Sequence, residues 1–135
     1  MSQQIIPKRG EVYLVNFDPI IGSKIRTLSR KNLDFADAQF RKTRPALIIQ
    51  NDIASRYSPV TIVAAITYQI GERVYPTEVL IEAGRSDLGK RCVVLLNQVR
   101  AIDKQRLVKR LAVFDSVLME KVNQALEISL GLVDL

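Results

Sequence analysis

The sequence predicts a mainly β domain that is closed by one C-terminal helix. Short apolar runs rich in β-branched residues recur from residue 11 to residue 114, and the hydrophobic period becomes helical after Asp115. No long helical pattern separates the runs, which favours a small twisted sheet or barrel over a βαβ fold. A chain of 135 residues can bury a core and has the size of one domain, so we expect residues 1–135 to form a single domain.

Each expected element follows from local composition. The strands are bounded by Gly, Pro, Asn and Asp, and we expect them at residues 11–17, 45–50, 60–67, 77–83, 92–97 with a continuation towards 102, and 109–114. We expect a plain connecting turn over residues 51–59. Beyond it, Leu118, Val122 and Ala125 recur at helical spacing, Asp115 or Ser116 can cap the helix, and Gly131 fits its end.

One segment is unusually long for a connection in a compact domain. Between the first two expected strands, residues 22–43 hold six Lys and Arg residues against two Asp residues, which is most of the net charge of +6. We therefore expect a long basic loop at residues 23–43. The helical spacing of Leu33, Ala36 and Phe40 is compatible with one amphipathic turn, and a simple surface insertion is the alternative.

The composition excludes several kinds of chemistry. The chain has no histidine and one cysteine, so zinc sites of the ordinary kind and Ser-His-Asp or Cys-His nucleophiles are excluded, and we expect no metal and no cofactor. Cys92 lies in an apolar run and is expected to be a small buried side chain. No signal peptide or membrane span is evident, which suggests a cytoplasmic protein that does not bind membranes. The positive charge favours nucleic acid as a partner.

Two polar side chains end neighbouring apolar runs. Arg44 precedes the run at 45–50, and Thr67 closes the run at 60–67. If the two strands pair in antiparallel fashion, the guanidinium and the hydroxyl could meet in one cleft. By spacing alone, a solvated edge charge and an ordinary strand threonine are the more common reading.

Several ordered motifs along the chain resemble those of the MazF/PemK family, the toxins of bacterial toxin–antitoxin pairs. The resemblance runs from about Lys8 to the C-terminus. It rests on Arg9-Gly10-Glu11-Val12-Tyr13, Thr43-Arg44-Pro45, Ile49-Gln50-Asn51-Asp52, Tyr57-Ser58-Pro59, Ala64-Ala65-Ile66-Thr67, Gln98-Val99-Arg100 and Ile102-Asp103-Lys104-Gln105-Arg106-Leu107.

The resemblance implies a fold, an activity and partners. The family fold is an SH3-like barrel with helices that forms a homodimer and binds single-stranded RNA. Its members are sequence-specific endoribonucleases that need no metal, leave 2′,3′-cyclic phosphate and 5′-hydroxyl ends, and are neutralised by an acidic antitoxin. The family's catalytic arginine and threonine fall on Arg44 and Thr67. DNA binding through the antitoxin complex and growth inhibition are further family traits.

The chemistry of the two residues is consistent with that role. A guanidinium presents a fork of donors that matches phosphate oxygens, so Arg44 can stabilise the charge that develops during cleavage. Thr67 would donate a hydrogen bond to the phosphate or orient the nucleophile. Ser23, Lys24, Arg41, Lys42 and Gln98 are candidate RNA contacts. Tyr57, Tyr68 and Phe17 could stack on bases, although aromatic residues in short strands are more often part of the core.

Two departures leave alternatives open. Lys24 stands where the family often has a glutamate proposed to aid catalysis, and Asn97 stands where a glutamate is common, so the proton acceptor is unassigned. A gyrase-poisoning toxin on the same barrel is one alternative, although those relatives carry a tryptophan near the C-terminus and this chain has none. A non-catalytic RNA-binding regulator is the other.

Overall fold

A computed structural model describes residues 4–17 and 42–134 of the chain. Six strands form one antiparallel sheet in the order β4-β5-β3-β2-β1-β6. Their bounds are β1 Glu11–Asn16, β2 Thr43–Ile48, β3 Val60–Thr67, β4 Glu78–Ile81, β5 Cys92–Asp103 and β6 Leu107–Val113. The predicted fold class, a mainly β domain with a C-terminal helix, is confirmed.

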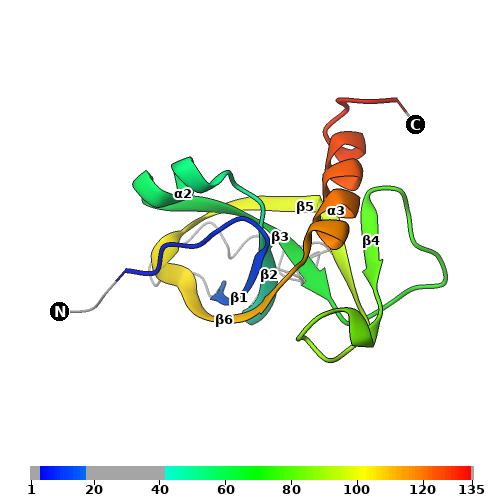
Figure 1. Cartoon of the computed structure of the whole chain (residues 1–135), viewed down its shortest axis with the longest axis horizontal. Helices are drawn as coiled ribbons and strands as arrows, with labels where there is room; N and C mark the ends of the chain where they lie inside the picture. The colour runs from blue at the N-terminus through cyan, green and yellow to red at the C-terminus, as the bar shows by residue number, and fades with distance from the viewer. Residues whose placement is uncertain (1–3, 18–41, 135) are drawn as a thin grey trace, which may run out of the picture.

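The sheet curls strongly, as the ring of β1, β2, β3, β5 and β6 in Figure 1 shows. A cluster of apolar side chains fills the inside of the curl and unites those five strands; we call it the barrel cluster. Its buried members are Tyr13, Val15, Phe17, Ala46, Ile48, Val63, Ile102 and Leu107. Because Ile102 of β5 and Leu107 of β6 pack with β1 residues, the corner between β5 and β6 folds back over the sheet, as in a small barrel.

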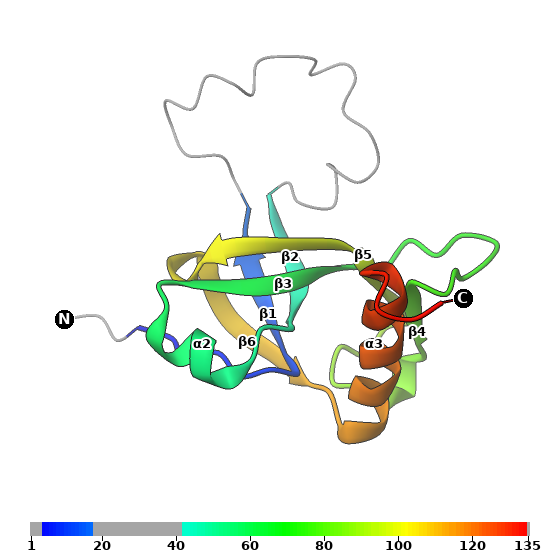
Figure 2. The same cartoon turned by 90° about the horizontal axis from the view of Figure 1, so that it is seen from above.

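The C-terminal helix α3, Ser116–Ser129, covers the other side of the sheet. Figure 2 shows it beside β4 and β5. A second, larger cluster of buried residues lies between the sheet and this helix, and we call it the helix-facing cluster. It unites Leu118, Val122 and Ala125 of α3 with strand residues, for example Leu47 and Ile66. Burial of each large side chain stabilises the fold by about 1.5–3 kcal/mol, so the helix is fixed by its apolar stripe.

The ends of α3 follow the prediction. The Asp115 carboxylate caps the helix by accepting a hydrogen bond of 2.9 Å from the Leu118 N–H. Gly131 adopts a φ of +75° just beyond the helix, a conformation that suits glycine at this position.

The connection between β2 and β3 differs from the prediction. A six-residue helix, α2 (Asp52–Tyr57), stands where we expected a plain turn. Its length is too short to show a helical hydrophobic period, which is why the sequence pattern missed it. Tertiary contacts hold it: the buried Lys104 ammonium donates to the carbonyl of Ser55 at 2.6 Å, and Ser55 and Thr61 share a hydrogen bond of 2.8 Å.

Smaller differences concern strand bounds. β2 begins at Thr43 rather than at residue 45, so Arg44 lies inside the strand. β5 runs without interruption to Asp103, β6 begins at Leu107, and β4 is only four residues long. Two short 3-10 turns, η3 (Ala83–Arg85) and η4 (Lys104–Arg106), precede β5 and β6. Within the described residues, no helix is both long and apolar enough to cross a membrane.

Candidate functional site

Arg44 and Thr67 lie on two hydrogen-bonded neighbouring strands. In the β2–β3 register, Ala46 is opposite Ala65 and Leu47 is opposite Ala64. Continued by two residues, this register sets Arg44 level with Thr67. Residues opposite each other on antiparallel strands project from the same face of a sheet, so the guanidinium and the hydroxyl share one face. The Arg44 side chain is exposed, whereas Thr67 is only 6% exposed.

One hydrogen bond holds the oxygen of the Thr67 hydroxyl in position. Its Oγ1 accepts a hydrogen bond of 3.0 Å from the backbone N–H of Gln69. A threonine hydroxyl has one donor and two acceptor sites, so the O–H is still available to donate to a ligand. On its other side, Thr67 pairs with Val93 of β5, which fixes the end of β3 within the sheet.

Gln98 lies in an irregular part of β5. Ala65 pairs with Leu95 but Ala64 pairs with Val99, so residues 96–98 form a bulge opposite β3. Bulges often redirect side chains near functional sites. The Gln98 Oε1 atom is buried and has no hydrogen-bond partner, the only such side-chain atom in the described part of the chain. An unpaired buried acceptor costs about 1–3 kcal/mol, which is expected where a ligand supplies the missing donor.

Lys42 is the one predicted RNA contact next to Arg44 that the structure describes. It adopts a φ of +59°, the only positive φ of a non-glycine residue in the described ranges. Its carbonyl accepts a hydrogen bond of 2.7 Å from the Phe17 N–H, which joins β1 to the start of β2. Such strained backbone often lies at functional sites. Ser23, Lys24, Arg41 and the predicted loop at 23–43, except Lys42 and Thr43, lie outside the described residues.

The three aromatic candidates have different surroundings. Phe17 is 7% exposed and belongs to the barrel cluster, as the core interpretation expected. Tyr57 and Tyr68 are 77% and 40% exposed, so neither is a core residue. A cation lies over each of the two tyrosine rings, Arg56 over Tyr57 at 5.7 Å and Lys90 over Tyr68 at 5.0 Å. No local pattern predicts the Lys90 contact, because 22 positions separate Tyr68 from Lys90 along the chain.

Cys92 takes no part in this site. The side chain is fully buried in the helix-facing cluster, as predicted, and burial raises the pKa of its thiol to about 11. A thiol with such a pKa stays protonated near neutral pH and is a poor nucleophile. In residues 4–17 and 42–134, no three His, Cys, Asp or Glu side chains lie together as possible metal ligands.

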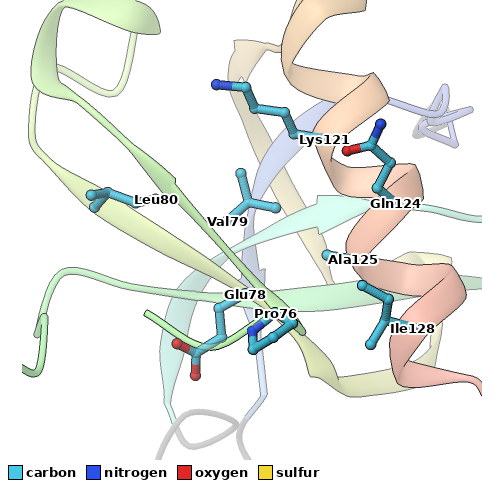
Figure 3. Close-up of a pocket in the computed structure, with 8 residues that line it drawn as sticks. All are labelled: Pro76, Glu78, Val79, Leu80, Lys121, Gln124, Ala125 and Ile128. Atoms are coloured by element: carbon cyan, nitrogen blue, oxygen red, sulfur yellow. The ribbon is translucent and has the colours of Figure 1, made fainter. Parts of the chain in front are cut away.

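A separate open groove of about 420 Å³ lies between β4 and α3 (Figure 3). Apolar residues such as Leu80 and Ile128 line it, and Glu78 and Lys121 are its charged members. In the sheet order, β5 and β3 lie between β4 and β2, so the groove is two strands away from the strand that carries Arg44.

Comparison with known proteins gives a family match over nearly the whole chain. A family model described as "PemK-like, MazF-like toxin of type II toxin-antitoxin system" matches residues 8–130. The chain is 43% identical over 130 residues to Endoribonuclease EndoA of Bacillus subtilis (strain 168), covering 96% of this chain and 99% of the relative. It is 41% identical to Endoribonuclease MazF of Staphylococcus saprophyticus, covering 93% and 92% of the two chains.

Solved structures share the fold. An endoribonuclease from mycobacterial species superposes with a TM-score of 0.70 at 21% identity, covering 96% of both chains. An endoribonuclease in complex with its cognate antitoxin, also from mycobacterial species, superposes with a TM-score of 0.67 at 24% identity, covering 96% and 99%. At these identities the likeness shows a common fold.

Proposed function

Because this chain belongs to the family of PemK-like, MazF-like toxins of type II toxin–antitoxin systems, we propose that it cleaves single-stranded RNA at the Arg44–Thr67 site. The predicted toxin family is confirmed, and the two curated relatives are both named endoribonucleases. The observation that carries the assignment of the site is the β2–β3 register, which sets a guanidinium and an oriented hydroxyl level with each other on one face. The reaction is sequence-specific and needs neither a metal ion nor a cofactor.

Arg44 stabilises the charge that develops at phosphorus. The 2′-hydroxyl of the substrate loses its proton as its oxygen attacks the adjacent phosphate, the bond from phosphorus to the 5′-oxygen breaks, and the leaving oxygen takes up a proton, so the step needs no net supply of protons. The products are a 2′,3′-cyclic phosphate and a 5′-hydroxyl. Negative charge grows on the non-bridging oxygens and on the leaving oxygen, and the exposed Arg44 side chain can reach both with its fork of N–H donors.

Thr67 supplies a second, fixed donor. Since its Oγ1 is used as an acceptor for the Gln69 N–H, its O–H is available to donate to a phosphate oxygen. A donor that is oriented before the substrate binds needs no reorganisation during the reaction, which is the condition under which such contacts accelerate it most.

Further contacts hold the RNA. Gln98 accepts a hydrogen bond from a base or a 2′-hydroxyl, which gives its buried Oε1 a partner. Lys42, beside Arg44, adds positive charge, and we extend the same role to Ser23, Lys24 and Arg41 from the sequence alone. The protein forms a homodimer and acts on RNA in the cytoplasm. An acidic antitoxin neutralises it by competing with RNA for this basic surface.

The test is cleavage of a long RNA in EDTA, with the ends of the products mapped. Wild-type protein free of antitoxin is expected to leave cyclic-phosphate ends. Arg44→Ala is expected to slow cleavage by at least about a thousandfold, since it removes the main charge stabilisation. Lys109→Ala removes one exposed cation from the edge strand β6 and is the matched control, with cleavage within about twofold of wild type. A folded wild-type protein that cuts no RNA would contradict the proposal.

A further inference from the structure

Strand β3 has a tyrosine paired with a cation just beyond each of its ends. Tyr57 and Arg56 precede the strand on α2, and Tyr68, contacted by Lys90, follows Thr67 directly. The strand has eight residues, so its two ends are about 23 Å apart. Figures 1 and 2 both show α2 at one end of β3 and the start of the β3–β4 connection at the other. Only the second pair is next to Arg44 and Thr67.

The position of Tyr68 is tied to that of Thr67. The hydrogen bond from the Gln69 N–H to the Thr67 Oγ1 closes a turn that has Tyr68 as its middle residue. The backbone of Tyr68 therefore cannot move without disturbing the Thr67 hydroxyl. The ring is 40% exposed, and it lies against Lys90 close to the start of β5.

The charges around Tyr68 favour an anionic ligand. Arg91 is engaged by Glu82 at 3.2 Å, but Lys90 makes no ion pair in the described part of the chain. Its ammonium therefore keeps its charge available while it contacts the ring. Burial, and to a lesser degree the neighbouring Cys92, raise the pKa of Tyr68, so the phenol stays neutral near pH 7 and does not repel a phosphate.

A half-exposed aromatic ring with a free cation beside it has the chemistry that binds single-stranded nucleic acid. The ring offers a stacking surface to any base, and the ammonium attracts the phosphate that follows. Continued by one residue, the β3–β5 register sets Tyr68 level with Cys92 of the helix-facing cluster, so the ring projects from the opposite side of the sheet to Thr67. Because β3 ends at Thr67, an RNA chain bound there can pass over this end of the sheet and meet the ring with a nucleotide that flanks the scissile phosphate.

We propose that Tyr68 and Lys90 form a base-stacking subsite, at the end of β3, for a nucleotide that flanks the cleaved bond. The subsite rests on the proposed ribonuclease function and adds to it the residues that hold a neighbouring base. It contributes to RNA affinity and to the choice of cleavage site, and it takes no part in the chemical step.

The experiment measures RNA binding separately from cleavage. Cleavage sites of the wild-type protein are first mapped on a long RNA. An oligoribonucleotide that spans the strongest site, with a 2′-O-methyl group on the nucleotide that would attack, then serves as the probe for dissociation constants. Stacking of one base is worth about 1–3 kcal/mol, so Tyr68→Ala is expected to weaken binding by about 5- to 150-fold. Tyr68→Phe keeps the ring and should bind as wild type does.

Two further variants separate stacking from packing and from charge. Tyr68→Leu restores apolar volume without an aromatic face and should bind as weakly as Tyr68→Ala. Lys90→Ala should weaken binding a few-fold and reduce the slope of log Kd against log salt by about 0.7, the value for one phosphate contact on a single strand. The matched control is Tyr57→Ala, which removes the other cation-paired tyrosine and should leave RNA affinity unchanged.

Each outcome decides the proposal. If Tyr68→Ala melts near the wild-type temperature and binds the probe within twofold of wild type, the stacking subsite does not exist. An equal loss of affinity in Tyr57→Ala would show a general surface effect and would also overturn it. If Tyr68→Leu rescues binding, the ring only packs. Failure of wild-type protein to cut any RNA would instead refute the ribonuclease function, so the two failures are distinct.

Discussion

The two ends of strand β3 carry similar polar residues in very different surroundings. At the α2 end, Thr61 is fully buried and shares a hydrogen bond with Ser55, and the Lys104 ammonium donates to the α2 carbonyls of Ser55 and Arg56 at 2.6 and 3.5 Å. At the other end, Thr67 has an O–H left to donate, and Arg44 beside it is exposed. The buried Gln98 Oε1, in the β5 bulge opposite Ala64 and Ala65, has no hydrogen-bond partner among the described residues.

This difference separates structural from functional polar groups. A buried polar group that is fully hydrogen-bonded within the protein stabilises the fold and has nothing to offer to a ligand. Buried donors and acceptors without a partner lower the stability of the fold. A ligand that forms hydrogen bonds with them recovers this free energy on binding. The α2 end is therefore a structural anchor, and the Thr67 end is the candidate site.

The largest effects are expected when the threonine at each end of β3 is replaced by alanine. Thr67→Ala should reduce the rate of RNA cleavage by about 10²–10³-fold, as loss of one oriented donor does in other enzymes, with little change in melting temperature. Thr61→Ala should do the reverse: it leaves buried Ser55 without one of its partners and should lower the free energy of unfolding by about 1–3 kcal/mol. Single-turnover cleavage and urea unfolding measure the two quantities. A stability loss in Thr67→Ala as large as in Thr61→Ala would erase the contrast.

A second variant acts at the α2 anchor alone. Lys104→Met keeps most of the side-chain volume but removes the ammonium that satisfies the carbonyls of Ser55 and Arg56. We expect a loss of about 2 kcal/mol in the free energy of unfolding, with cleavage at saturating RNA unchanged. Urea titration checks the first expectation and kcat checks the second. A drop in kcat in folded protein would mean that α2 communicates with the site.

The smallest effect on stability is expected at Gln98, with the opposite sign. Gln98→Met removes a buried acceptor that has no partner, so the free energy of unfolding should rise by about 1 kcal/mol while RNA affinity falls. Thermal unfolding and the uncleavable RNA probe report the two quantities on one preparation. If stability falls as well, Gln98 is a structural residue and does not belong with Thr67.

Much of the fold could be predicted because its signals are local. Alternation in β1, the apolar runs of β2, β3 and β5, and the change of period at Asp115 all lie within short windows. The α2 helix was predicted wrongly as a turn because Lys104, 49 positions from Ser55, supplies one of the contacts that hold it. Likewise, the β5 bulge depends on the pairing with β3, and residues 92–102 give no sign of it.

For the site, the sequence alone determined the residue types and the family. The absence of histidine, the net charge of +6 and the ordered motifs predicted a toxin that cleaves RNA without a metal ion. They also indicated Arg44 and Thr67 as its candidate catalytic residues. The tertiary structure decided which polar groups remain unused. The β2–β3 register sets Arg44 level with Thr67, the Gln98 Oε1 finds no partner among the described residues, and Lys90 meets Tyr68. Hydrogen-bond partners are chosen by proximity in space, and a linear pattern does not contain that information.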